Sequence, residues 1–305
     1  MSRQLGKPRL NLAFSDMWGH DNYRFNPQLN YFLSLFQLKY DTRIVANNAD
    51  LLIFSSYGQN YKNITAKKKL YFSNEIIGDI NRPIQDYDAQ IGAVRFAEPS
   101  RFVFFPHFVI YINWFNEPMF LRMRSPSCLL TLEQVNYSQF RTKSTRANYF
   151  CTIYSNPVEG RVETIKYLSR HFKFDNHGRL LNNTGGPLGG TEYEKLVVLS
   201  SYKFSLASEN IISPHYVSEK LLHCMATGTV PVYLGSDLFK SYFNEKAVLD
   251  AKKFENRELV EKIGEIANDE RFYRDFLDVE KLNMNAVLQF SPLLILSKLE
   301  QAVSL

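Results

Sequence analysis

The stretch YKFSLASENIISPHYVSEKLLHCMATGTVPVYLGS, residues 202–236, predicts a strand, a helix and a second strand in direct succession. The expected elements are a strand at 202–208, a loop at 209–215, a helix at 216–227 and a strand at 229–234. Apolar residues share one face of this helix, and Gly228 stands where a helix C-cap is expected. The stretch therefore predicts a βαβ unit of an α/β domain.

In βαβ units, ligands bind beyond the carboxyl ends of the strands and at the N-terminus of the helix. Unpaired N–H groups and the helix dipole favour anions there. Tyr216, Ser218, Glu219 and Lys220 stand at this end of the expected helix. The sequence therefore predicts an anion-binding site around these residues.

The α/β alternation continues on both sides of this unit. In the first half, a strand is expected at 10–14 and a helix at 29–40, followed by short apolar runs at 44–45, 51–54, 70–72, 102–105 and 108–115. In the second half, a strand is expected at 149–154 and a helix at 160–169. The glycine-rich loop that follows lacks the Gly-Lys-Ser/Thr of a phosphate-binding loop and is interpreted as a connector.

A polar, basic segment at 138–146 is the expected domain boundary. It divides the chain into an N-terminal domain at 1–146 and a C-terminal domain at 147–305. A length of 305 residues with 45% hydrophobic content agrees with two domains.

The net charge of +5 favours an anionic partner. The basic run at 67–69 lacks the aromatic interleaving of a nucleic-acid reader, so nucleic acid is not the expected partner. Three cysteines without metal-ligand spacing indicate a reducing compartment. Without a signal-peptide pattern or an apolar run of ~18 residues, the expected location is the cytoplasm, with peripheral contact at the inner face of the membrane left open.

The segments at 202–210, 215–221 and 228–236 together resemble the signature of glycosyltransferase family 10, the α1,3/4-fucosyltransferases. Weaker likeness covers Met17-Trp18-Gly19, residues 68–75 and the Asn156-Pro157 turn before Arg161, and the chain is most similar to the soluble bacterial members. The resemblance implies an α/β fold of the GT-B type, with two Rossmann-like domains facing across a cleft. The loop at 211–214 and the tail beyond Ser291 depart from the family pattern.

The resemblance implies an inverting α1,3-fucosyltransferase. It would move L-fucose from GDP-fucose to a hydroxyl of a glycan acceptor, such as the GlcNAc of N-acetyllactosamine chains. By position, the donor-binding residues would be Arg161, Asn210, Tyr216, Glu219 and Lys220 in the C-terminal domain. Glu75 would be the catalytic base, and Glu219 would also act in catalysis by holding fucose hydroxyls or balancing charge on the sugar ring.

Each of these residues also has a simpler interpretation. Arg161 and Lys220 fit solvated helix positions, and Glu219 fits plain compensation of the helix dipole. Tyr216 and Asn210 fit loop or capping roles, and a glutamate such as Glu75 after a strand is usually solvated.

Trp18, His20 and Asp21 follow the first strand and suit sugar stacking and hydroxyl binding by the N-terminal domain, although a tryptophan there fits the core equally well. Asp86-Tyr87-Asp88 spells an Asp-X-Asp pattern that binds metal in other glycosyltransferases. The resembled family is metal-independent, so no cofactor is expected to be required and Mn²⁺ or Mg²⁺ would at most stimulate release of GDP. Two alternatives stay open: a GT-B transferase with another nucleotide sugar, and a non-catalytic relative that binds glycans or nucleotides.

Overall fold

The computed structural model describes residues 6–19, 26–73, 83–117, 128–137, 148–158 and 160–305. The chain forms two compact units, the first comprising Met1–Ile110 with Leu288–Leu305 and the second Tyr111–Val287. This division differs from the expected boundary at residue 146 in two places. Residues 111–146 group with the second unit, and the last 18 residues return to the first, where their helix packs on the sheet.

In its described residues the first unit holds a six-stranded parallel sheet in the order β2-β1-β3-β4-β5-β6. Its strands are β1 (Arg9–Ser15), β2 (Asp41–Ile44), β3 (Ala49–Phe54), β4 (Ala66–Ser73), β5 (Ala89–Gly92) and β6 (Phe102–Phe104), and its helices are α1 (Pro27–Gln37) and α10 (Pro292–Val303). Asn26 caps α1 by accepting from the N–H groups of Gln28 and Leu29.

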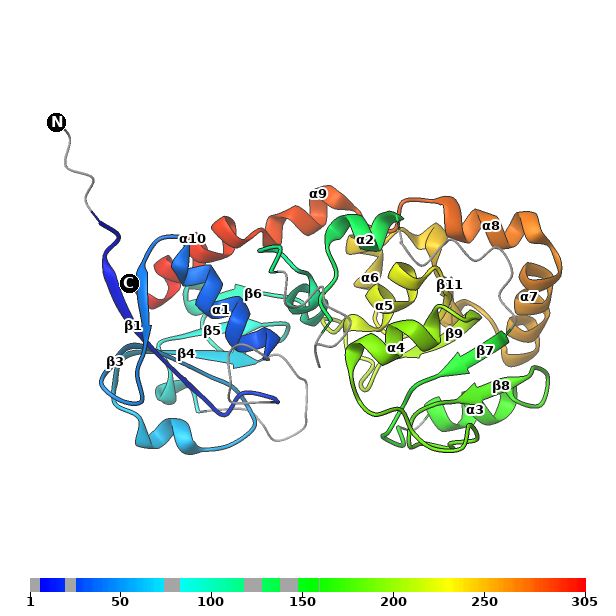
Figure 1. The fold of residues 1–305 in the computed structure, drawn as a ribbon, viewed down its shortest axis with the longest axis horizontal. Coiled ribbons are helices and arrows are strands. Elements are labelled where there is room, and N and C mark those ends of the chain that lie inside the picture. The colour runs from blue at the N-terminus through cyan, green and yellow to red at the C-terminus, as the bar shows by residue number, and fades with distance from the viewer. Residues whose placement is uncertain (1–5, 20–25, 74–82, 118–127, 138–147, 159) are drawn as a thin grey trace. The chain divides into compact units, whose positions relative to one another are not determined.

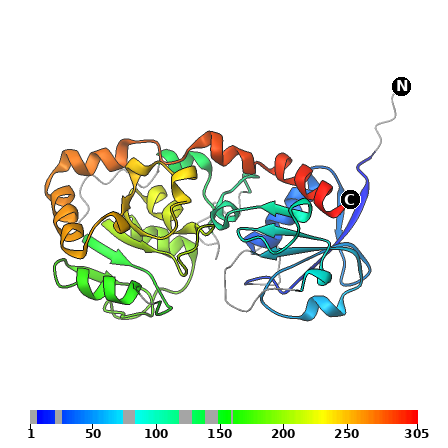
Figure 2. The same cartoon turned by 180° about the vertical axis from the view of Figure 1, so that it is seen from behind.

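Neighbouring side chains of β4 face opposite sides of this sheet. Tyr71 packs with Phe54 on one face, whereas Phe72 meets Phe32 of α1 on the other. Helix α10 lies along β5 and β6 (Figures 1 and 2), and one face of it is buried, namely Ile295, Leu296, Leu299 and Val303. The C-terminal helix therefore completes the cover of a sheet made by the first third of the chain.

The described part of the second unit holds a five-stranded parallel sheet in the order β11-β10-β9-β7-β8. Its strands are β7 (Asn148–Thr152), β8 (Phe174–Asn176), β9 (Tyr202–Ser208), β10 (Val230–Leu234) and β11 (Leu249–Asp250). Its helices are α2 (Leu132–Tyr137), α3 (Arg161–Leu168), α4 (Glu192–Leu199), α5 (Glu219–Thr227), α6 (Phe239–Tyr242), α7 (Asn256–Asn268), α8 (Glu270–Asp278) and α9 (Met284–Val287).

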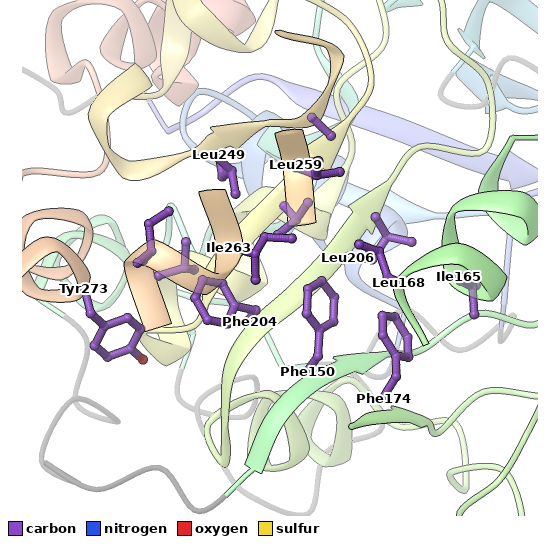
Figure 3. Packing of buried hydrophobic residues seen from close by; sticks show 14 of the residues in the cluster. Phe150, Ile165, Leu168, Phe174, Phe204, Leu206, Leu249, Leu259, Ile263 and Tyr273 are labelled. Carbon is purple, nitrogen blue, oxygen red and sulfur yellow. The ribbon is translucent and has the colours of Figure 1, made fainter. Parts of the chain in front are cut away.

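Helices cover both faces of the second sheet. Phe204 and Leu206 of β9 belong to a core with apolar residues of α3, α7 and α8 (Figure 3). The small residues Ser205 and Ala207 alternate with them and line a pocket together with residues of α4 and α5. The expected α/β fold with parallel sheets is confirmed.

The βαβ prediction at 202–236 is confirmed, because β9 and β10 pair in parallel and α5 connects them. The helix begins at Glu219 rather than at 216, since Ser218 is the N-cap and has extended backbone angles. It ends at Gly228, whose φ of 67° is the left-handed conformation of a C-cap. Among the residues described, no helix has the length and apolar character that crossing a membrane requires.

Candidate functional site

The order of strands in the second unit marks one place where a ligand site is expected. From β7 the chain moves outward to β8, and it then returns to place β9 on the other side of β7. In open parallel sheets, ligands bind at the carboxyl ends of the strands where the order reverses in this way. The residues that follow β7 and β9 therefore lie at the expected site.

Arg161 lies at this point and is buried, with 1% of its surface exposed. Its Nη1 donates to the carbonyl of Asn156, and its Nη2 donates to the carbonyl of Ser208 at 2.8 Å and to Oδ1 of Asn210 at 2.9 Å. The guanidinium lies 3.9 Å from the ring centroid of Tyr154. The solvated interpretation of Arg161 is therefore wrong, because its side chain ties the end of β9 to the segment after β7.

Lys220 lies in the first turn of α5 and is also largely buried, with 15% of its side chain exposed. Its Nζ donates to Oγ of Ser218 at 3.0 Å and to Oε2 of Glu209 at 3.3 Å, and lies 3.7 Å from Oε1 of Glu219. Burial alone would lower the pKa of Lys220, but the carboxylates of Glu219 and Glu209 raise it above its ordinary value. Lys220 is therefore a fixed cation.

Glu209 belongs to the 202–210 segment that resembles the family signature, but the sequence does not predict a role for it in the site. It is buried, and its Oε1 accepts from the backbone N–H of Ser218 at 2.9 Å. Its Oε2 accepts from the hydroxyl of the same serine at 2.5 Å. A glutamate directly after a strand carries no sequence signal for such burial, since its partners lie 9 and 11 residues further along the chain.

The structure also brings Glu219, Asn210 and Tyr216 to this end of the unit. Glu219 is the first residue of α5, and its carboxylate pairs with Lys220. Asn210 accepts from Arg161, and Tyr216 is buried, so neither residue caps α5, whose N-cap is Ser218. All five predicted donor-binding residues thus lie in the second unit, between the carboxyl ends of the strands and the start of α5.

A pocket of about 50 Å³ adjoins this cluster between β9, α4 and α5. Lys195, Glu219, Lys220 and His223 form its polar wall. A buried cavity of about 150 Å³ holds one benzene molecule, so this smaller pocket has room for only part of a nucleotide sugar.

In the first unit, Trp18 follows β1 and Tyr57 follows β3, at the place where the strand order of that sheet reverses. Their ring centroids are 5.0 Å apart, and Trp18 is 62% exposed. Asn26 donates to the carbonyl of Trp18 at 2.7 Å. The core interpretation of Trp18 is therefore wrong, whereas His20, Asp21 and Glu75 lie outside the described residues.

Both carboxylates of the Asp-X-Asp pattern have structural partners. Asp86 accepts from the hydroxyl of Tyr61 at 2.5 Å. Asp88 accepts from the backbone N–H of Lys69 at 2.8 Å and pairs with Lys68 at 3.6 Å. These contacts hold the loop before β5 against β4 and the turn after β3.

Comparison with known proteins relates part of this chain to a family. Residues 141–291 match the model of the C-terminal domain of glycosyltransferase family 10, the fucosyltransferases. α-(1,3)-Fucosyltransferase B of Drosophila melanogaster is 32% identical over 136 residues, 41% of this chain and 30% of that protein. GDP-fucose protein O-fucosyltransferase 3 of Xenopus tropicalis is 23% identical over 164 residues, 51% of this chain and 34% of that protein. The chain spans about a third of the length of these curated relatives.

A crystal structure of an α1,3-fucosyltransferase with GDP-fucose is similar over 100% of this chain and 93% of its own, with a TM-score of 0.71 and 18% identity. This likeness confirms the expected GT-B fold. Residues 141–291 therefore form a domain of glycosyltransferase family 10, the fucosyltransferases.

Proposed function

We propose that this protein transfers L-fucose from GDP-fucose to an acceptor hydroxyl and inverts the anomeric centre. The observation that carries the proposal is the pair of buried cations, Arg161 and Lys220, at the carboxyl ends of β7 and β9. Breaking the bond between fucose and the diphosphate adds negative charge to the leaving group, and fixed cations stabilise charge that develops beside them.

The two cations would contribute differently. Four of the five N–H groups of Arg161 already have acceptors, namely the carbonyls of Asn156 and Ser208 and the side chains of Ser208 and Asn210. Lys220 is the more exposed of the two and lies at the positive end of α5. We propose that Lys220 contacts the diphosphate directly, while Arg161 holds Asn210 in place and adds its charge.

Two carboxylates complete the proposed chemistry. Glu219 would bind fucose hydroxyls or balance positive charge on the sugar ring, which its position beside Lys220 supports. Tyr216, buried just before α5, would contact the donor as the family resemblance implies. Glu75 would remove the proton from the acceptor hydroxyl, a role that rests on the resemblance alone.

The proposed acceptor is the GlcNAc of an N-acetyllactosamine-type glycan, linked at its 3-position. The exposed Trp18 ring beside Tyr57 supports a sugar acceptor, because aromatic faces pack against sugar rings. The similarity to GDP-fucose protein O-fucosyltransferase 3 favours a second candidate, a hydroxyl of a protein.

We further propose that transfer requires no metal. Arg161 and Lys220 supply positive charge beside the proposed diphosphate site. The structural partners of Asp86 and Asp88 support a non-catalytic role for the Asp-X-Asp pattern. Mn²⁺ or Mg²⁺ would only assist the release of GDP.

One assay tests the proposed donor, the proposed acceptor and the independence from metal. GDP release is measured with GDP-fucose alone, with N-acetyllactosamine, and with a protein acceptor rich in serine and threonine, before and after dialysis against a chelator. GDP-mannose replaces GDP-fucose in a parallel arm. The proposal expects GDP release that depends on N-acetyllactosamine, survives chelation and yields an α-linked product by NMR. Release with the protein alone would select the second acceptor, and equal release from GDP-mannose would contradict the donor assignment.

A further inference from the structure

The carboxylate of Glu209 is buried at the end of β9 and takes part in four contacts. It accepts from the N–H and the hydroxyl of Ser218 and from Nζ of Lys220, and the hydroxyl of Tyr233 lies 3.4 Å from Oε1. Burying a carboxylate is costly unless charge and hydrogen bonds compensate for lost water. This carboxylate receives both kinds of compensation.

The surrounding backbone is built around the Glu209 side chain. A Cβ atom on Gly235 would lie 2.7 Å from Cγ of Glu209 and 2.3 Å from the hydroxyl oxygen of Tyr233. Only glycine therefore allows the segment after β10 to pass so close to both side chains. The hydroxyl of Ser236 donates to the carbonyl of Pro214 at 2.9 Å and fixes the loop that leads from Glu209 to Ser218.

Glu209 and Lys220 also share a partner. The hydroxyl of Ser218 donates to Oε2 of Glu209 at 2.5 Å, and Nζ of Lys220 donates to the oxygen of the same hydroxyl at 3.0 Å. Together with the direct contact of 3.3 Å, these bonds form a closed triangle. A lysine side chain is flexible, and the triangle restricts where its ammonium group is placed.

We propose that Glu209 is a positioning residue that holds Lys220 and the first turn of α5 in the geometry that receives the donor diphosphate. The inference rests on the proposed function, since it gives Lys220 a diphosphate to bind. Its proposed action on the donor is indirect, through its contacts with Lys220 and Ser218. Preorganisation of this kind strengthens binding because the cation is already fixed before the ligand arrives.

A double-mutant cycle tests the coupling of Glu209 to Lys220, with GDP affinity measured by calorimetry. Glu209→Gln keeps the shape of the side chain and removes its charge. We expect it to weaken GDP binding about tenfold in the wild-type background and to have no further effect in Lys220→Ala. Glu194→Gln is the matched control, because Glu194 also binds backbone at a helix start but is exposed and has no contact with Lys220. It should leave GDP affinity unchanged.

A purely structural role would give a different pattern. Unchanged GDP affinity in Glu209→Gln, or an equal loss in both backgrounds, would overturn the inference. If Glu209→Gln fails to fold, as judged by circular dichroism, the cycle is run with Ser218→Ala, which removes the hydroxyl that Glu209 and Lys220 share, and the same two outcomes decide. No GDP binding by the wild-type protein would instead overturn the proposed donor, and the inference with it.

Discussion

Arg161 begins α3, but its guanidinium extends to the ends of two strands and is buried there. We expect Arg161→Ala to weaken GDP binding, since it removes a positive charge from the site. The change should also lower the free energy of unfolding by about 1–3 kcal/mol, because buried carbonyl groups lose their donor. Calorimetry with GDP and urea denaturation measure the two effects. Arg170→Ala is the control, because Arg170 is exposed and lies just after α3. Equal changes of GDP affinity in both variants would contradict the placement of Arg161 in the donor site.

Glu75 lies outside the described residues, and its role is the part of the site that depends most on resemblance. We expect Glu75→Gln to slow turnover at least ~100-fold, the low end for loss of a general base. GDP-fucose affinity should change little, because the base acts on the acceptor. Steady-state kinetics measure the turnover, and calorimetry measures the affinity for GDP-fucose. Turnover above half of the wild-type value would show that Glu75 is not the catalytic base.

Trp18 presents its ring to solvent beside Tyr57. We expect Trp18→Ala to raise KM for the acceptor about 5- to 150-fold, since stacking of a ring is worth ~1–3 kcal/mol by analogy with bases on aromatic side chains. KM for GDP-fucose should stay the same. Tyr137→Ala, which removes another exposed aromatic ring, is the control. An unchanged acceptor KM would show that the acceptor binds elsewhere.

The site residues that could be predicted from the sequence are those marked by a local sequence pattern. Lys220 and Glu219 stand at a recognisable helix start, and the motif names them. The burial of Arg161 was not predictable, since its acceptor on Ser208 lies 47 residues away. Glu209 was missed for the same reason: what makes it unusual is the set of neighbours that the fold assembles around it.

At the scale of elements, the glycine that caps α5 is expected to stabilise its helix, whereas the glycine inside α7 is expected to destabilise its helix. Gly228 adopts the left-handed C-cap conformation, whereas Gly264 lies inside α7 with open space where a Cβ would be. We expect Gly228→Ala to lower the free energy of unfolding by about 1 kcal/mol. Gly264→Ala should raise it by about 0.5–1 kcal/mol, because alanine favours helix interiors. Thermal denaturation measures both shifts, and the same sign for the two variants would contradict this account of α5.

The βαβ unit and α3 were predicted well, whereas several short strands, α4 and every element after residue 236 were not. The strand at 202–208 is β9 to the residue, and the helix expected at 160–169 is α3 with one residue less at each end. Helix α4 and the short strands β5 and β8 were not predicted, since three or four residues carry no reliable period and α4 follows a glycine-rich loop. The adjacency of β7 and β9, which creates the site, depends on long-range pairing that no local pattern encodes.

At the scale of the whole molecule, α10 is expected to stabilise the unit made by the first part of the chain. Leu299 is fully buried in that unit, whereas Leu293 on the same helix is 69% exposed. Leu299→Ala should cost about 2–5 kcal/mol and Leu293→Ala less than ~0.5 kcal/mol. Urea denaturation of the full chain compares the two. Equal costs would mean that α10 does not pack on β5 and β6 in solution.

The division into units was predicted only in part. Two α/β units follow from the repeated alternation of strands and helices, but the boundary at residue 146 assumed that each unit is one continuous stretch. Composition gives no sign that the chain returns to its first sheet, because an apolar helix face does not by itself specify the sheet on which it packs. Packing against β5, β6 and α1 decides the matter.

This return has a consequence for synthesis on the ribosome. Strands β5 and β6 are complete by residue 104, but the helix that covers them begins only at residue 292. At a translation rate of ~5–20 residues per second, the apolar surface of β5 and β6 stays uncovered for roughly 10–40 seconds before α10 is synthesised. The second unit, which ends at Val287, therefore has all of its residues before the first unit does. Until α10 is synthesised, the exposed apolar face of the N-terminal sheet is the kind of surface that chaperones bind.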